Sequence, residues 1–216
     1  LNVKAVAIGS GVSMAFLGNS HYGIEDASIM RSIPNLTVIS PADCGEIVKT
    51  VFAAAEYEGP LYIRLTGGTN NPVVYKEDYD FKIGKAITLR KGSKITIIAN
   101  GTMVNESLEA AKLLEVKGLS ATVVNMHTIK PLDTSVIDKA IASSRLIVSV
   151  EEHSIIGGLG GAIAEYKTAI SGAPPQLILG LPDKFGKVGE HRYLLDKYGL
   201  TAYHIAERIY NKYEIL

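Results

Sequence analysis

Two side chains in the first third of the sequence could do chemistry at a ligand. His21 ends the small polar run GNSH, directly before a predicted helix. A histidine in such a loop can shuttle a proton or donate to an oxyanion, although an ordinary surface histidine would look the same. Arg64 stands at the carboxyl end of the apolar run at 61–65. An arginine that ends a buried strand needs an anionic partner, either a carboxylate of the protein or a phosphate of a ligand.

Two stretches near residue 150 also combine polar and glycine residues. Glu151, Glu152 and His153 are predicted at the carboxyl end of a strand, where sites of α/β proteins form. They could be ligands or catalysts, but we expect the carboxylates to cap the next helix or to pair across an interface. The run GGLGG at 157–161 follows a strand and opens a helix, a place where anions bind. Because residue 163 is Ile where the dinucleotide fingerprint needs a third glycine, we expect close packing of that helix onto the sheet.

Composition and motifs exclude several classes of protein. The 22 basic and 22 acidic side chains cancel, and the sequence has no basic cluster with interleaved aromatics, so we expect no nucleic-acid partner. It contains no P-loop and no Gly-x-Ser-x-Gly elbow, and its five histidines lie far apart, which predicts no metal site in this chain. No apolar run reaches about 18 residues, so we expect no membrane association. The single cysteine, Cys44, favours a reducing compartment and hence a cytoplasmic location.

The first 65 residues alternate short apolar strands with helical segments. Strands are predicted at 3–8, 36–40 and 61–65, and helices at 24–32 and from 43 to about 57. Asp43 and Glu46 form a capping box at the start of the second helix. A helix between successive strands predicts a parallel sheet, and both faces of such a sheet need cover. Because this unit is small, we expect an edge or face that further sequence or a partner chain completes.

The remainder of the chain repeats this alternation more fully. Four strands are predicted, at 94–99, 121–126, 146–150 and 176–181. Five helices accompany them, at 105–116, 133–143, 157–170, 192–198 and 202–213. Residues 66–93 are rich in Gly, Asn, Asp and Lys, with extended pieces near 73–75 and 85–89. We therefore divide this α/β chain into a first domain at 1–80, a linker at 81–93 and a second domain at 94–216.

Taken together, the sequence resembles the transketolase family, in the form whose carboxyl-terminal half is a separate polypeptide. The resemblance covers nearly the whole chain. It is most specific at HYGIEDASIMRSIPNLTVISPADCGE (21–46), GPLYIRL (59–65) and EEHSIIGGLGG (151–161). Further agreement comes at NMHTIKPLD, LPDKFGKVGE and LDKYGLTA. Deoxyxylulose-phosphate synthase and the beta chains of 2-oxoacid dehydrogenases share the layout but match these stretches less well.

The resemblance implies an incomplete thiamine-diphosphate pyrimidine-binding domain, followed by a transketolase C-terminal domain built as a three-layer α/β sandwich. It implies an enzyme that moves a two-carbon unit between sugar phosphates with thiamine diphosphate and Mg²⁺. In the family the residues that bind this cofactor lie mainly upstream of Leu1, so we expect no cofactor-binding residue here and no activity of the chain alone. An amino-terminal transketolase section would be the partner, and the second domain would support a homo-oligomer such as a dimer.

The resemblance also gives the two candidate site residues a role. His21 falls on the family histidine that contacts the sugar near its reacting carbons, which makes it the catalytic candidate. Arg64 falls on an arginine that holds the substrate phosphate, which makes it the substrate-phosphate-binding candidate.

The sequence departs from the family pattern just before His21. Phe16 and Leu17 stand where Glu-Asp is usual, Gly9 replaces a histidine and Tyr22 replaces a glutamine. The family aspartate reads a sugar hydroxyl, which Leu17 cannot do. The substrate could therefore be unusual, or the alignment could be displaced before residue 18. Two alternatives stay open: a non-catalytic assembly module, and a related enzyme that acts on pyruvate-like donors.

Overall fold

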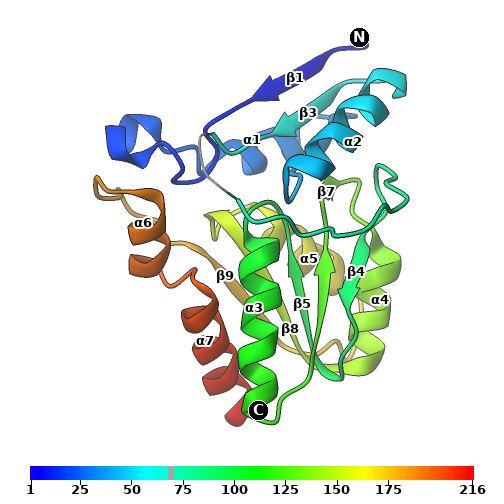
Figure 1. The fold of residues 1–216 in the computed structure, drawn as a ribbon. Coiled ribbons are helices and arrows are strands. Elements are labelled where there is room, and N and C mark those ends of the chain that lie inside the picture. The colour runs from blue at the N-terminus through cyan, green and yellow to red at the C-terminus, as the bar shows by residue number, and fades with distance from the viewer. Residues whose placement is uncertain (68–70) are drawn as a thin grey trace.

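The computed structural model describes residues 1–67 and 71–216, and within them the strands form two sheets that lie one above the other (Figure 1). The first sheet has the strand order β1-β3-β2-β7, and the second has the order β4-β6-β5-β8-β9. None of the helices in this described part has the length and apolar composition needed to cross a membrane.

The first sheet is a small parallel sheet with one antiparallel addition. Its strands are β1 (Lys4–Ala7), β3 (Leu61–Arg64), β2 (Thr37–Ile39) and β7 (Thr128–Lys130). The first three run parallel, and β7 pairs antiparallel with β2. Helix α1 (Asp26–Ser32) packs on the face of Val38, whereas α2 (Cys44–Glu56) packs on the face of Ile39. Adjacent strand residues point to opposite faces, so each face receives its own helix.

One edge of the first sheet is uncovered. Strand β1 pairs with β3 on one side, and its Val6 side chain is 57% exposed, followed by Ile8 at 77%. The predicted open edge is therefore present at β1. Whether further sequence or a partner chain completes this edge stays a prediction.

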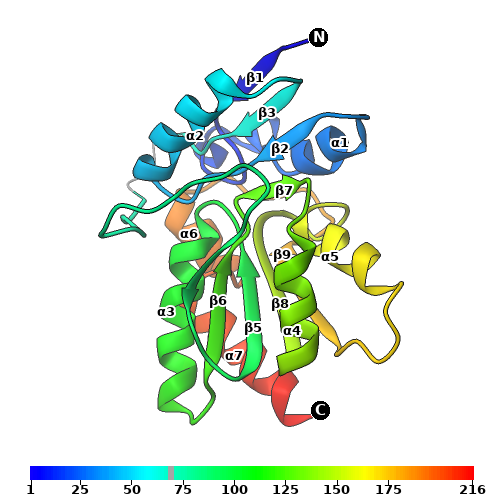
Figure 2. The ribbon, with the colours of Figure 1, turned by 90° about the vertical axis from the view of Figure 1, so that its right-hand side faces the viewer.

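The second sheet is larger and covered on both faces. Its strands are β4 (Ile87–Arg90), β6 (Ala121–Asn125), β5 (Lys94–Ala99), β8 (Ser144–Ser154) and β9 (Gln176–Leu181). Strand β4 is antiparallel to β6, and the other pairs are parallel. One face is packed by α3 (Met103–Val116), α6 (His191–Lys197) and α7 (Ala202–Glu214), and the other by α4 (Thr134–Ser143) and α5 (Leu159–Lys167) (Figure 2). The predicted α/β class and the three-layer second unit are confirmed.

Several details differ from the sequence prediction. Strand β8 continues to Ser154 instead of ending at Val150, and residues 73–75 form no strand. Strand β7 was not predicted, and it leaves the second unit to join the first sheet. Its three residues have no distinctive pattern, because a short pairing of this kind depends on the strand that it meets. The division of the chain at 80 and 94 stays a prediction, and β7 shows that the two units are interleaved.

The buried carboxylate of Glu46, near the start of α2, joins the segment after β3 to both units. Asp43 Oδ1 accepts the amide of Glu46 at 2.8 Å, so the predicted helix cap is formed. Glu46 Oε1 accepts bonds from the hydroxyls of Tyr75 and Tyr79 at 3.1 and 3.2 Å, and from Asn125 Nδ2 at 2.9 Å. Burial raises the pKa of Glu46, although these donors oppose the rise. The cluster fixes the connecting segment between α2 and the end of β6.

Candidate substrate-binding site

The loop at residues 8–24 leaves β1 and carries the predicted catalytic residue. It contains two short 3₁₀ turns, η1 (Ala15–Leu17) and η2 (Asn19–His21). Its two ends are tied together, because Gly11 and Gly23 exchange backbone hydrogen bonds of 2.7 and 3.0 Å. Gly11 has φ +68°, and a Cβ there would lie 2.2 Å from Glu152 Oε1. Only glycine fits this close approach, which seats the loop against the second unit.

His21 lies at the exposed surface of this loop. Its Nδ1 hydrogen-bonds the hydroxyl of Ser20 at 3.0 Å. His21 lines an open hollow of about 270 Å³ together with Gly9, Met14 and Gly23, among others. An exposed imidazole in such a hollow can donate to or accept from a bound ligand. The family's Asp and His positions hold Leu17 and Gly9 here, so these two residues bring no polar side chain to the loop.

Arg64 is buried, and it is engaged by protein groups. Its Nε forms an ion pair with Asp26 Oδ2 at 2.8 Å, and Tyr62 donates to the same oxygen at 2.8 Å. Its Nη2 donates to the carbonyls of Gly23 and Glu152, both at 2.9 Å. Of the two anionic partners that the sequence allowed, the structure shows the carboxylate. The phosphate-binding role stays a prediction, and a phosphate would have to join or replace Asp26 at this guanidinium.

The structure places the two predicted site residues on either side of one short segment. His21 lies two residues before Gly23, whose carbonyl accepts the hydrogen bond from Arg64. Parallel strands β1 and β3 end at the same edge of the sheet, so the loop that follows β1 meets the last residue of β3 there. Arg64 therefore fixes the end of the loop that bears His21.

Glu151 is a helix cap, as predicted for one of these carboxylates. Its Oε2 accepts the amide of Leu159 at 2.7 Å, and its Oε1 accepts the amide of Gly160 at 2.8 Å, at the start of α5. Complete burial raises the pKa of Glu151 to about 7, against the lowering effect of the two amides. The close packing predicted for the GGLGG run is also confirmed. A Cβ at Gly158 would lie 2.1 Å from Glu151 Oε2, and one at Gly160 would lie 2.6 Å from Ile178 of β9.

Glu152 connects the His21 loop to two helices of the second unit, a role that the sequence did not reveal. Its Oε1 accepts the amide of Val12 at 2.7 Å and bonds His191 Nε2 at 3.0 Å, while Thr102 donates to Oε2 at 2.5 Å. Burial alone would raise the pKa of Glu152 and lower that of His191. Their mutual hydrogen bond and charge outweigh burial, so the pKa of Glu152 is lowered and that of His191 is raised. The Glu152 side chain is buried and that of His191 is 18% exposed, and the two groups form an ion pair when the imidazole is protonated.

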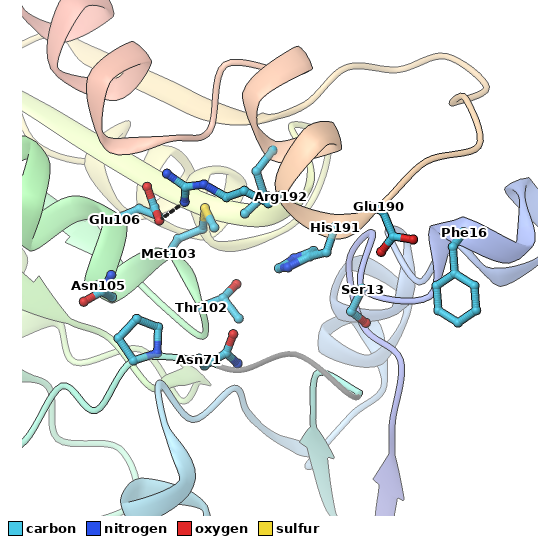
Figure 3. Close-up of a pocket in the computed structure, with 12 residues that line it drawn as sticks. Ser13, Phe16, Asn71, Thr102, Met103, Asn105, Glu106, Glu190, His191 and Arg192 are labelled. Atoms are coloured by element: carbon cyan, nitrogen blue, oxygen red, sulfur yellow. Dashed lines mark hydrogen bonds and ion pairs between the residues drawn. The ribbon is translucent and has the colours of Figure 1, made fainter.

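A polar pocket of about 400 Å³ opens beside this ion pair, between the first-unit loop and helices α3 and α6 (Figure 3). Arg192 and Glu106 form an ion pair in its wall, with Nη1 and Oε1 2.5 Å apart. Glu106 also accepts the amide of Ala202 at 2.6 Å. Arg192 and Glu106 therefore satisfy each other's charge in this wall.

Comparison with known proteins agrees with this geometry. Residues 84–205 match the family model described as transketolase, C-terminal domain, and residues 1–70 match the one described as transketolase, pyrimidine binding domain. The first match alone covers more than half of the chain. The chain therefore belongs to the transketolase family, and the predicted resemblance to its carboxyl-terminal section is confirmed.

Individual relatives show how much of a whole protein the chain represents. A transketolase C-terminal section of Methanocaldococcus jannaschii is 43% identical over 212 residues, which are 97% of this chain and 66% of the relative. A 1-deoxy-D-xylulose-5-phosphate synthase of Dictyoglomus thermophilum is 38% identical over 193 residues, 89% of this chain and 31% of the synthase. A solved split-gene transketolase, described as an inactive beta4 tetramer, is 39% identical with a TM-score of 0.87, covering 98% of this chain and 66% of its own. The chain thus spans just under two thirds of the first and third of these.

Proposed function

We propose that this chain is the carboxyl-terminal section of a thiamine-diphosphate-dependent transketolase that moves a two-carbon ketol unit between sugar phosphates. The observation that carries the proposal is the placement of His21. His21 lines an open hollow at the carboxyl edge of the first sheet, while the loop around it is tied at Gly11–Gly23. Family membership supports the class of chemistry.

His21 acts on the substrate in this proposal. Its imidazole donates a hydrogen bond to an oxygen near the reacting carbons of the sugar, or accepts the proton of a hydroxyl there. The Ser20 hydroxyl at Nδ1 influences which ring nitrogen carries the proton. Arg64 orients the substrate phosphate, which joins or replaces Asp26 at the guanidinium.

The cofactor's diphosphate and metal are bound elsewhere in the intact enzyme. The transketolase family depends on thiamine diphosphate. Among residues 1–67 and 71–216, no three His, Cys, Asp or Glu side chains lie close enough together to hold a metal ion. Mg²⁺ beside a diphosphate commonly needs only one or two protein carboxylates, and we assign both groups to an amino-terminal section because the chain matches a transketolase C-terminal section. When bound, the cofactor supplies the carbanion chemistry of the reaction.

Assembly belongs to the same proposal. The relative named as a C-terminal section and the split-gene neighbour support a partner that carries the amino-terminal section. We assign the contact of a homo-oligomer to the second unit because it matches the transketolase C-terminal domain, and the free Cys44 suits a cytoplasmic enzyme. The chain alone is inactive in this view, because the cofactor site is incomplete.

The test is reconstitution of the complete gene product with its amino-terminal section, thiamine diphosphate and Mg²⁺. Two-carbon transfer between sugar phosphates is expected, and His21→Asn should lower kcat/KM by about 100-fold or more, the usual range for a proton-transferring or oxyanion-binding group. His204→Asn, a substitution on the remote helix α7, is the matched control. Absence of cofactor-dependent transfer by the reconstituted complex would sink the proposal.

Arg64 separates a phosphosugar enzyme from the related enzyme that acts on pyruvate-like donors. Arg64→Ala should raise KM for phosphorylated acceptors by about tenfold or more, the effect of losing one charged hydrogen-bond donor, and should change KM for unphosphorylated acceptors much less. Because Asp26 loses its partner in this variant, Asp26→Asn is measured beside it. An equal effect on both acceptor classes would favour a structural role for Arg64. Because the chain is similar to a deoxyxylulose-phosphate synthase, pyruvate-like donors are tested in the same assay.

The second alternative is a non-catalytic assembly module. It is favoured by Leu17 and Gly9, which stand where the family has polar groups. Leu17→Asp distinguishes the two. An assembly module should gain no transfer activity from this substitution, whereas an enzyme for an unusual sugar should already be active and change its substrate preference. Gly9 is kept in this test, because its φ of +86° disfavours any larger residue.

A further inference from the structure

The loop Pro182–Gly189 of the second unit lies against the turn that carries His21. We call it the clamp loop. Asn19 Nδ2 donates to the Gly186 carbonyl at 3.0 Å, and the Gly186 amide donates to Asn19 Oδ1 at 2.7 Å. The hydroxyl of Tyr22 donates to the carbonyl of Lys187 at 2.6 Å. Asn19 and Tyr22 flank His21 in the sequence, so both sides of the histidine are attached to the same short loop.

The clamp loop is itself anchored to the core of the second unit. The amide of Lys187 donates to the hydroxyl of Tyr198, at the end of α6, at 3.1 Å. The Tyr22 and Tyr198 hydroxyls lie 3.5 Å apart, and both rings pack against the main hydrophobic cluster. The amide of Gly189 also donates to the carbonyl of Ala15, at the start of η1, at 3.4 Å. Tyr22 thus joins the His21 turn, the clamp loop and a helix in one hydrogen-bonded group.

Steric fit shows that the contact is close. A Cβ at Gly186 would lie 2.1 Å from Tyr22 Cε2 and 2.3 Å from Cζ, so the tyrosine ring occupies the space where any larger residue would place its side chain. Burial raises the pKa of the Tyr22 phenol, and the Tyr198 hydroxyl raises it further. The hydroxyl therefore stays protonated and keeps its donor role at neutral pH.

The His21 turn needs such an attachment. It is a single 3₁₀ turn, held internally by the amide of His21 bonding the Gly18 carbonyl at 3.0 Å and that of Tyr22 bonding the Asn19 carbonyl at 3.1 Å. A turn this short is not stable by itself. Without the clamp loop, the imidazole would sample several positions over the hollow, and a catalytic group displaced by about 1 Å loses much of its effect.

We propose that Tyr22 and Asn19 are positioning residues, which fix His21 toward the substrate by fastening its turn to the clamp loop of the C-terminal domain. The idea rests on the proposed function for its catalytic consequence. It assigns a task to Tyr22, one of the positions at which the chain departs from the family pattern. It also makes the second unit a contributor to the active site, in addition to any role in assembly.

The attachment of the His21 turn to the clamp loop is tested on the complete chain by amide hydrogen exchange. Tyr22→Phe removes only the hydroxyl, and Asn19→Ala removes both bonds to Gly186. Both variants should speed amide exchange by about fivefold or more in segments 15–24 and 182–189, as expected when a hydrogen bond that limits local opening is lost. Exchange in the strands of the second sheet should not change. Tyr203→Phe on α7 is the control, because that tyrosine contacts a different region. Unchanged amide exchange in both segments would show that these hydrogen bonds do not hold the His21 turn to the clamp loop.

The catalytic part is tested in the complex with the amino-terminal section, thiamine diphosphate and Mg²⁺. Tyr22→Phe should lower kcat about five- to tenfold, as for one neutral hydrogen bond, and leave KM within about twofold. In a His21→Ala background the same substitution should have no further effect, because Tyr22 acts through His21. An equal loss in both backgrounds would show that Tyr22 acts elsewhere and would refute positioning. If the complex shows no two-carbon transfer at all, the proposed function fails, and hydrogen exchange still decides whether the clamp exists.

Discussion

The two sheets of this chain both belong to α/β units, yet the edge strand β1 of the first is largely exposed whereas the central strand β5 of the second is buried. In the second sheet, Ile97 and Ile98 of the central strand β5 are both fully buried, one on each face. In the first sheet, β1 lies at an open edge and Val6 is 57% exposed. The inner strands β2 and β3 of the first sheet are buried as well, so the contrast lies at its open edge. The first sheet supplies the loop on which His21 lies, and contacts of Glu152, Arg64 and the clamp loop hold that loop in place.

The largest expected effect tests this difference directly. Ile97→Ala should lower the free energy of unfolding by about 4 kcal/mol, because it leaves a cavity in a fully packed core. Val6→Ala should cost less than about 0.5 kcal/mol, because the side chain is already largely in water. Urea denaturation of both variants measures the contrast. Similar losses of unfolding free energy in the two variants would mean that β1 is covered in solution, and the contrast between the two sheets would not hold.

The link between the two regions should be of intermediate strength. Glu152→Gln removes the charge that faces His191 and should cost about 2 kcal/mol, the range of a hydrogen bond to a charged group. Glu109→Gln is the control, because that carboxylate forms an exposed pair with Lys112 and should contribute less than about 0.5 kcal/mol. If Glu152→Gln is also neutral, the loop at Val12 does not depend on the second unit.

The same ion pair predicts a pH dependence with a definite sign. The pKa of His191 is raised in the folded protein, so its stabilisation is complete below its unfolded pKa and is lost as the pH rises through the folded value. The free energy of unfolding of the wild type should therefore exceed that of His191→Gln by about 1.5 kcal/mol at pH 6, and by less at pH 9. Denaturation at several pH values checks this. In a Glu152→Gln background the pH dependence of the difference should disappear, and its persistence would point to another partner.

The smallest effect is expected at the surface bridge between the two regions. Arg31 of α1 and Glu165 of α5 form an ion pair of 2.5 Å, but the Glu165 side chain is 64% exposed. Glu165→Gln should change stability by less than about 0.5 kcal/mol, because solvent screens such pairs. Thermal unfolding of this variant measures the change in stability. A large loss would show that the outer contact, rather than the buried one at Glu152, holds the regions together.

Much of the fold was predictable from the sequence because its signals are local. Buried strands such as 94–99 are continuous β-branched runs, and Pro34 ends the first helix as proline chemistry requires. Asp43 capped α2 as its spacing indicated. The helix after the GGLGG run was predicted for a comparable reason, from residue 157, and α5 begins at Leu159. In each case the residues that decide the structure are neighbours in the chain.

The site was only partly predictable, since its contacts join residues far apart. Arg64 was known to need an anion, but only the folded chain brings Asp26 to it, 38 residues away. The pairing of Glu152 with His191 spans 39 residues. Tyr22 looked like a simple departure from a family pattern, and its contact with Lys187 crosses 165 residues. Nothing in a local pattern specifies such partners.

The sequence by itself determined the α/β class, most elements and the presence of His21 and Arg64 at the edge of a parallel sheet. These follow from hydrophobic periodicity, turn chemistry and the burial that a strand imposes on its residues. The tertiary structure alone decided what surrounds those residues: β7 crossing into the first sheet, Asp26 at Arg64, and the clamp loop beside His21. Long-range packing selects these contacts, because each depends on where two separately formed elements meet.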